Sequence, residues 1–191
     1  MGGERSLGTT EAGFSRIFDR LRPQILAYCL RRTSTHDADD ATSEVFTIAW
    51  RRRHDMPGGD QTLPWLYGVA RNVVSDQWRG ARRRRNLIAK ATGFREPAPR
   101  GPEDVLIEHE DYRHLRAALT RLGEFDREVL LLSAWEGLTY SEIAAAIGAS
   151  LAAVDKRIAR AKERLARQYD LVVQSSDRSS SAGRWKGDGG R

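Results

Sequence analysis

Arginine and lysine side chains gather in two short stretches of the 191-residue sequence, and they are well suited to binding a polyanion. The first stretch contains Arg79 and the run Arg82 to Arg85, and the second runs from Lys156 to Arg167. The whole chain has 32 Lys and Arg against 26 Asp and Glu, a formal net charge of +6. Two separate basic regions predict two contacts with nucleic acid, although a solvated helix face would explain either region alone.

Acidic side chains form clusters of their own, between Asp37 and Glu44 and between Glu103 and Asp111. Because like charges repel, an acidic face does not suit the same polyanion. These segments therefore predict a second partner that presents a basic surface.

Groups that could support catalysis or hold a metal ion are sparse. The four histidines show no ligand spacing, and the single cysteine, Cys29, excludes a disulfide framework and a cysteine-based zinc site. An enzyme acting on nucleic acid would need clustered carboxylates or a metal set around a pocket, so we predict no catalytic residue, metal or cofactor. One cluster remains an alternative metal site, although only some of its members share a helix face: His36, Asp39, Asp40 and Glu44.

Helices must position these groups, because apolar residues recur with a 3.6-residue period and strand-like alternation is absent. The pattern predicts helices over about 11–32 and 37–54, and a third that Thr62 caps with Pro64 in its first turn. In the second half, Gly123 is predicted to end a helix that begins near Tyr112. The predicted buried stripes of the first three helices are Phe14, Ile17, Leu21 and Ile25, then Ala38, Ala41, Val45, Ile48 and Ala49, then Leu66, Val69, Ala70 and Val73.

A proline-rich segment with Pro97, Pro99 and Pro102 divides the chain. We predict an all-α fold with a loose N-terminus (1–10), a first helical domain (11–91), a linker (92–103), a second helical domain (104–172) and a disordered serine-rich tail (173–191). No stretch approaches the roughly 20 apolar residues of a membrane span, and no signal-peptide run is present, so we expect a cytoplasmic protein.

The second domain ends in a pattern typical of a helix-turn-helix. Thr139 and Glu142 have capping-box spacing, Gly148 suits a tight turn, and Ser150 can cap the helix that follows. That helix separates an apolar face from a basic face, Val154, Ile158, Ala161 and Leu165 against Lys156, Arg157, Arg160 and Arg164. The basic face suits a DNA major groove, and a plain αα-hairpin with a solvated side is the alternative. Asp155 would accept from a cytosine amino group or pair with a neighbouring arginine.

Three segments, Asp37–Arg51, Leu63–Asn72 and Tyr140–Gly148, closely resemble bacterial sigma factors of the extracytoplasmic-function (ECF) subfamily, in the same order and spacing. The resemblance covers about residues 11 to 170. It implies a sigma region two before the linker and a region four after it. It also implies a non-catalytic subunit that binds core RNA polymerase at the β′ clamp and β flap, directs it to promoter DNA, melts that DNA and is controlled by an anti-sigma factor.

The resemblance also implies roles for particular residues. Contact with a coiled coil of the β′ clamp falls to Asp39, Asp40, Ser43, Glu44, Phe46 and Thr47, with Phe46 as an apolar anchor. Reading of the minus-ten element falls to the loop before the third helix and to Trp65, Arg71, Asn72, Asp76, Arg79 and Arg83. Reading of the minus-thirty-five element falls to Ser150, Ala153, Lys156, Arg157 and Arg160.

Two alternatives stay open at this stage. Ordinary core packing would explain Trp65 and Trp78 as well as stacking on an unpaired base does. An ordinary helix-turn-helix regulator with an N-terminal sensory domain would explain the second domain, but it leaves the acidic face and the arginine-bearing helix of the first domain unexplained.

Overall fold

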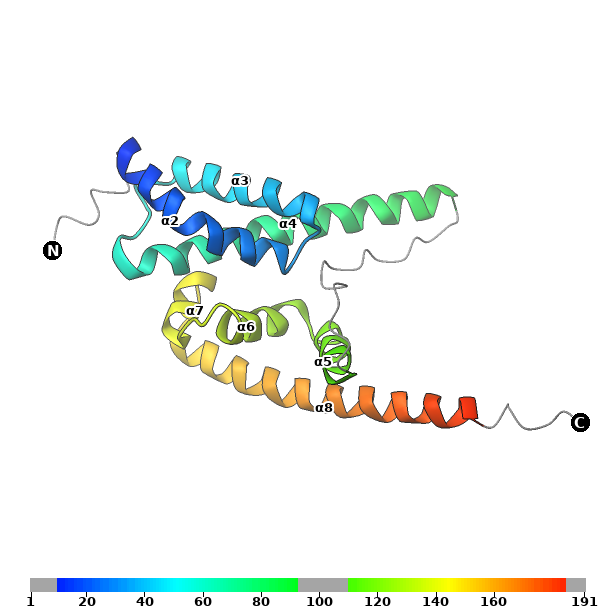
Figure 1. Ribbon diagram of the computed structural model, residues 1–191. Coiled ribbons are helices and arrows are strands. Elements are labelled where there is room, and N and C mark those ends of the chain that lie inside the picture. The colour runs from blue at the N-terminus through cyan, green and yellow to red at the C-terminus, as the bar shows by residue number, and fades with distance from the viewer. Residues whose placement is uncertain (1–9, 93–109, 185–191) are drawn as a thin grey trace, which may run out of the picture. The chain divides into compact units, whose positions relative to one another are not determined.

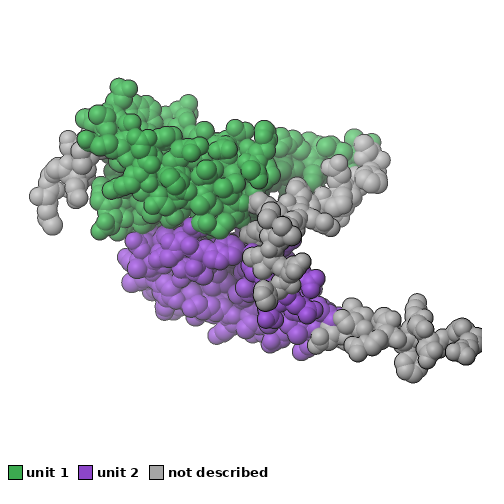
Figure 2. Space-filling model, viewed as in Figure 1, with its two compact units in different colours: residues 1–105, 145–148 green, residues 106–144, 149–191 purple. Residues whose placement is uncertain are grey.

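The computed structural model describes residues 10–92 and 110–184, and every regular element in these two ranges is a helix (Figure 1). The predicted all-α class is therefore confirmed. The chain divides into two compact units, residues 1–105 with 145–148 and residues 106–144 with 149–191 (Figure 2). The predicted linker beyond Thr92 lies outside the described residues, as does the predicted loose N-terminus before Thr10. None of the described helices is long and apolar enough to cross a membrane.

The first unit contains α2 (Glu11–Leu30), α3 (Thr35–Arg51), the single 3₁₀ turn η1 (Gly59–Gln61) and α4 (Thr62–Thr92). Hydroxyl caps start the first two helices. Thr10 Oγ1 accepts from the Gly13 amide at 3.2 Å, and Ser34 Oγ accepts from the Asp37 amide at 3.2 Å. A short turn joins α2 to α3, and both helices pack against α4.

The core of the first unit lies between these three helices. Its buried side chains are Leu21, Ile25, Tyr28 and Cys29 from α2, Ala38, Ala41, Val45 and Ala49 from α3, and Leu66, Val69, Ala70 and Val73 from α4. The predicted stripe of α4 is confirmed in full. Ile48 is half-buried, and Phe14 and Ile17 are also half-buried, because the tightly packed part of α2 lies nearer its C-terminal end.

Thr62 is the first residue of α4 and does not act as the predicted side-chain cap. Its buried hydroxyl donates a hydrogen bond to the Pro57 carbonyl at 2.8 Å, so it fastens the preceding loop to the helix. Pro64 does lie in the first turn, where the missing amide has no intrahelical acceptor to satisfy.

The second unit contains α5 (Glu110–Thr120), α6 (Glu124–Ala134), α8 (Leu151–Arg184) and the first five residues of α7 (Tyr140–Ile147). The prediction that Gly123 ends α5 is wrong. The helix ends at Thr120, and Gly123 has a φ of −59° and is the N-cap residue of α6. The core includes Ala118, Val129, Leu132, Ile143, Val154 and Ile158.

Helix α8 continues to Arg184, so the prediction of a disordered tail is wrong for residues 173–184 (Figure 1). The helix is held by α5 well beyond the helix-turn-helix. Val172 is buried, and Ser176 Oγ lies 3.0 Å from Nε2 of His114 on α5. Composition alone missed these contacts, because they come from a helix more than 50 residues earlier in the chain. The last part of the predicted tail, 185–191, lies outside the described residues.

Candidate nucleic-acid and protein interfaces

The acidic side chains of α3 lie on an exposed helix surface. Asp40, Ser43, Glu44 and Thr47 are all exposed and follow the i, i+3, i+4, i+7 spacing of one helix face. Asp39 is exposed beside them and pairs with Arg22 of α2 at 3.3 Å. Because exposed ion pairs contribute only about 0–1 kcal/mol, the pair leaves the Asp39 carboxylate accessible to another cation. We call these five residues the α3 face.

Phe46 does not belong to the α3 face, so its predicted role as an apolar anchor is wrong. Its side chain is buried, and its ring lies edge-on to Phe14 and Phe18, with centroid separations of 6.4 and 4.8 Å. A partner that docks on α3 would not reach it. Phe46 lies four residues after Thr42, which is also buried, so the buried side of α3 is wider than the predicted stripe.

Four polar side chains follow one exposed line along α4. Asn72, Asp76, Arg79 and Arg83 are exposed and spaced by four, three and four residues. Asp76 and Arg79 form an ion pair at 2.5 Å within this line, which we call the α4 stripe. It offers one amide and two guanidinium groups to a ligand, with one carboxylate already paired.

Two other residues of α4 that were predicted to contact DNA are less exposed than the α4 stripe. Arg71 is half-buried and lies about 100° around the helix from Asn72, although its Nη1 donates to Asn72 Oδ1 at 3.5 Å. Trp65 is half-buried at the start of the helix, with the Arg52 guanidinium 5.6 Å from its ring centroid. Both side chains therefore have protein contacts of their own and only part of their surface open.

Trp78 is half-buried and has a fixed contact within the first unit. Its indole N–H donates to the backbone carbonyl of Arg32 at 3.1 Å. This hydrogen bond ties the middle of α4 to the turn between α2 and α3, where Arg32 also lies over the Tyr28 ring at 3.6 Å. Trp78 thus fixes the helix that carries the α4 stripe.

The predicted helix-turn-helix signals are confirmed around α7 and the start of α8. The Thr139 amide donates to Glu142 Oε2 at 2.8 Å, and the Glu142 amide donates to Thr139 Oγ1 at 3.3 Å, which makes a reciprocal capping box. Gly148 has a φ of +68°, in the left-handed region that favours glycine. Ser150 Oγ accepts from the Ala153 amide at 3.2 Å and caps α8.

The N-terminal part of α8 presents a polar face and buries an apolar one. Val154, Ile158 and Ala161 are buried, and Leu165 is half-buried. All five predicted contact residues are exposed on the other sides of the helix, namely Ser150, Ala153, Lys156, Arg157 and Arg160. We call these five residues the α8 face.

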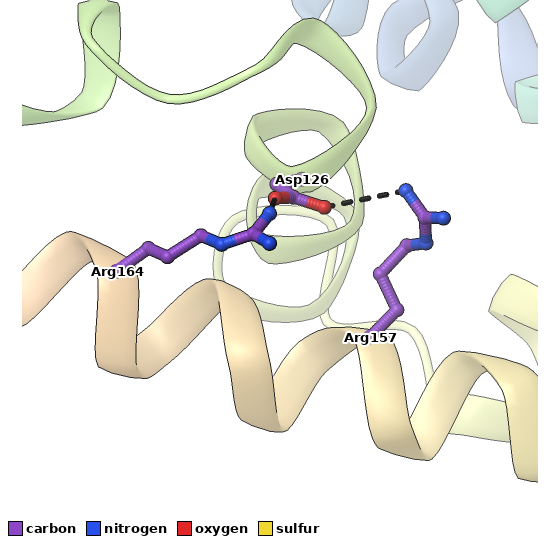
Figure 3. Close-up of polar contacts among 3 residues, drawn as sticks. All are labelled: Asp126, Arg157 and Arg164. Atoms are coloured by element: carbon purple, nitrogen blue, oxygen red, sulfur yellow. Dashed lines mark hydrogen bonds and ion pairs between the residues drawn. The ribbon is translucent and has the colours of Figure 1, made fainter.

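Arg157 differs from the rest of the α8 face because residues of α6 hold it. Its Nη1 lies 3.3 Å from Asp126 Oδ1, and its guanidinium carbon lies 4.4 Å from the centroid of the Phe125 ring. Arg164 pairs with the other oxygen of Asp126 (Figure 3). Sequence reasoning missed Asp126, because an acid in the first turn of a helix is ordinarily an exposed dipole-compensating residue.

In residues 10–92 and 110–184, no group of three or more His, Cys, Asp or Glu side chains is arranged to hold a metal ion. This part of the chain includes His36, Asp39, Asp40 and Glu44, the alternative metal site. Cys29 is fully buried in the first unit.

Family models match both units of the chain, sigma-70 region 2 over residues 17–84 and sigma-70 region 4 over residues 112–165. The ECF RNA polymerase sigma factor SigD of Mycobacterium tuberculosis is 33% identical over 168 residues, which cover 84% of this chain and 77% of that protein. The RNA polymerase sigma factor CnrH of Cupriavidus metallidurans is 30% identical over 142 residues, 70% of this chain and 74% of CnrH.

Solved structures share the fold. The sigma factor RpoE from Bartonella quintana, in complex with the anti-sigma factor NepR, matches with a TM-score of 0.60 and 21% identity over 83% of this chain and 97% of that one. CnrH in complex with the cytosolic domain of CnrY matches with a TM-score of 0.59 and 24% identity over 88% and 97%. With both sigma regions in order and a relative of this identity and coverage, the chain belongs to the ECF RNA polymerase sigma factors.

Proposed function

We propose that this sigma factor binds core RNA polymerase through the α3 face, directs it to promoters and helps to open the DNA, with no catalysis of its own. The observation that carries the proposal is the separation of charge between exposed surfaces. The α3 face is acidic, whereas the α4 stripe and the α8 face expose arginine and lysine. One class of surface suits a basic protein partner and the other suits DNA.

The α3 face has the chemistry to dock on a basic coiled coil of the polymerase clamp. Asp40 and Glu44 lie one helical turn apart, and Ser43 and Thr47 add hydroxyl groups beside them. Such a surface would steer association by charge and fix register through its polar groups. The β flap would then be the second polymerase contact, made by the second unit.

The α4 stripe suits an opened minus-ten element. Asn72 offers a donor and an acceptor to an unpaired base edge, and Arg79 and Arg83 offer cations to the strand backbone. The half-buried Trp65 exposes part of a ring on which a base can stack, which contributes about 1–3 kcal/mol per base. Unstacking costs a few kcal/mol, so opening a short segment needs the polymerase contacts as well.

The α8 face suits the major groove of a minus-thirty-five element. Lys156, Arg157 and Arg160 are exposed within the first three turns of the helix, the part that enters the groove in helix-turn-helix proteins. An arginine there can make two hydrogen bonds to guanine O6 and N7. Asp155, directly before Lys156, is also exposed, and it would accept from a cytosine amino group or pair with an arginine.

We infer that an anti-sigma factor holds the protein inactive. The RpoE and CnrH structures, which share this fold, were solved with NepR and with the cytosolic domain of CnrY. A protein that covered the α3 face would compete directly with polymerase. Because polymerase works in the cytoplasm, the proposal also places this chain there.

Run-off transcription with purified core polymerase tests the proposal. Templates would be a panel of promoters, and permanganate would detect thymines that become unpaired. We expect start sites and unpaired thymines that core polymerase alone does not produce, and co-purification of the two proteins. If the chain neither binds core polymerase nor changes where synthesis begins, the proposed function is wrong.

A further inference from the structure

The carboxylate of Asp126 is buried between two arginines of α8. Its side chain is 8% exposed, and each oxygen has its own partner, Oδ1 with Arg157 and Oδ2 with Arg164. The two arginines are seven residues apart, about 10 Å along the helix. Figure 3 shows their guanidinium groups converging on Asp126 from opposite sides. One acid of α6 therefore sets the direction of two long side chains of α8.

The two arginines that pair with Asp126 lie at different places on α8. Arg157 belongs to the α8 face, near the N-terminus of the helix, whereas Arg164 lies two turns further along. The Phe125 ring covers the flat face of the Arg157 guanidinium, with the guanidinium carbon 4.4 Å from the ring centroid. The next residue of α6, Asp126, contacts the edge of the same guanidinium at Nη1. The Arg157 side chain is still 45% exposed.

This arrangement leaves donors of Arg157 available to a ligand. A guanidinium carries five N–H groups in a planar fork, and the contact with Asp126 uses one of the two on Nη1. A side chain held in this way loses less conformational entropy on binding than a free arginine does. The fixed plane of the fork also favours a bidentate contact over a diffuse one.

We propose that Asp126 is a positioning residue that presents Arg157 to a base edge of the upstream promoter element and so determines selectivity for that element. The proposal rests on the proposed function, because it assumes that the α8 face reads DNA. Asp126 itself touches no DNA.

A purely stabilising role for Asp126 predicts something different. Arg164 alone supplies one cation to neutralise the buried acid, and loss of stability would weaken binding to every DNA sequence equally. A positioning role predicts a loss confined to the matched sequence. Binding to unrelated DNA should stay level or rise, because a negative charge has been removed near the phosphates.

The test compares two duplexes bound by holoenzyme that contains the full-length protein. The first is the best-bound duplex from a pool randomised over the upstream element, and the second carries the same element scrambled. The variants are Asp126→Asn, Arg157→Ala and the two combined. Glu163→Gln serves as the charge-matched control, because it also removes one carboxylate, an exposed one on α8, the helix that carries Arg157. Far-ultraviolet circular dichroism and thermal melting follow the fold of each variant.

We expect Asp126→Asn to lower the ratio of matched to scrambled affinity by at least about fivefold, the lower end of the discrimination a bidentate base contact gives. In the Arg157→Ala background the same substitution should have no further effect on the ratio. Glu163→Gln should leave the ratio unchanged. If Asp126→Asn does not fold, Asp126→Glu replaces it; the longer side chain displaces the carboxylate, and the same loss of ratio is expected.

Two results would overturn the inference. One is an unchanged ratio in a folded Asp126 variant while Arg157→Ala lowers it. The other is an equal drop in ratio with and without Arg157. A failure of the proposed function looks different, because the wild-type holoenzyme would then not discriminate between the two duplexes at all.

Discussion

The phenol of Tyr169 on α8 donates a hydrogen bond to the Asp111 carboxylate on α5, at 3.3 Å and across 58 residues of sequence. His114 on the same side of α5 contacts both Tyr169, with its ring centroid 6.3 Å away, and Ser176, at 3.0 Å. The extension of α8 beyond the helix-turn-helix is therefore part of the second unit, and it secures the first helix of that unit.

This contact predicts a pH-dependent effect of Tyr169→Phe. Desolvation, the nearby Asp111 charge, the hydrogen bond to it and the Asp170 charge raise the pKa of Tyr169 above its usual 10.0. Because the folded pKa exceeds the unfolded one, the stabilisation is fully present below about pH 10 and is lost as the pH rises through the folded pKa. Urea midpoints should favour the wild type at about pH 8, and the gap should narrow above about pH 10. An equal gap at both pH values would contradict this prediction.

Charge reversal on the α3 face should strongly weaken polymerase binding. Asp40→Lys with Glu44→Lys places two cations against a basic surface, and like charges at an interface cost several kcal/mol, so binding should weaken by at least about tenfold. Biolayer interferometry with immobilised core polymerase measures it. Asp19→Lys, at an exposed position of α2, is the control that reverses an acidic charge outside the α3 face, and it should bind normally. Unchanged affinity in the double variant would remove α3 from the docking surface.

Arg83→Ala should reduce the salt dependence of promoter binding. Each neutralised phosphate contributes about 0.9 to the log–log slope on duplex DNA and about 0.7 on single strands, so the loss of one contact should lower the slope by that amount. Holoenzyme binding across a salt titration gives the slope. Arg20→Ala removes an exposed arginine of α2 and should leave it unaltered. A slope that is the same for wild type and Arg83→Ala would show that Arg83 contacts no phosphate.

Phe46→Ala should act on stability. Truncation of a buried phenylalanine typically costs about 3–5 kcal/mol of unfolding free energy, and the rings of Phe14 and Phe18 would each lose one ring contact. Ser43→Ala, exposed on the same helix, should change it by less than about 0.5 kcal/mol. Urea unfolding of the wild type and the two variants measures these changes in the free energy of unfolding. A Phe46→Ala protein as stable as the wild type, with weaker polymerase binding, would restore Phe46 to the interface.

Local signals in the sequence predicted local structure well. The capping box of Thr139 and Glu142, the left-handed Gly148 and the Ser150 cap each depend on residues within four positions of one another. The buried stripe of α4 was equally predictable, because a helix of known period leaves little choice of which side faces the core.

Predictions failed where a distant element decides the outcome. Phe46 lies at the edge of the α3 stripe, and only the rings on α2 make it a core residue. Asp126 has the position of an ordinary first-turn acid, and only the two arginines of α8 explain its burial. The serine-rich segment after Val173 has the composition of a tail, yet α5 supports its helix as far as Ser176.

The placement of Cys29 provides a measurement that needs no engineering. It is the chain's one thiol, and it is 0% exposed among the side chains of α2. An alkylating reagent can reach the sulfur only when that part of the first unit opens, so its labelling rate reports the opening of this unit independently of the other. A slower rate after a partner is added would show that the partner stabilises the first unit against opening.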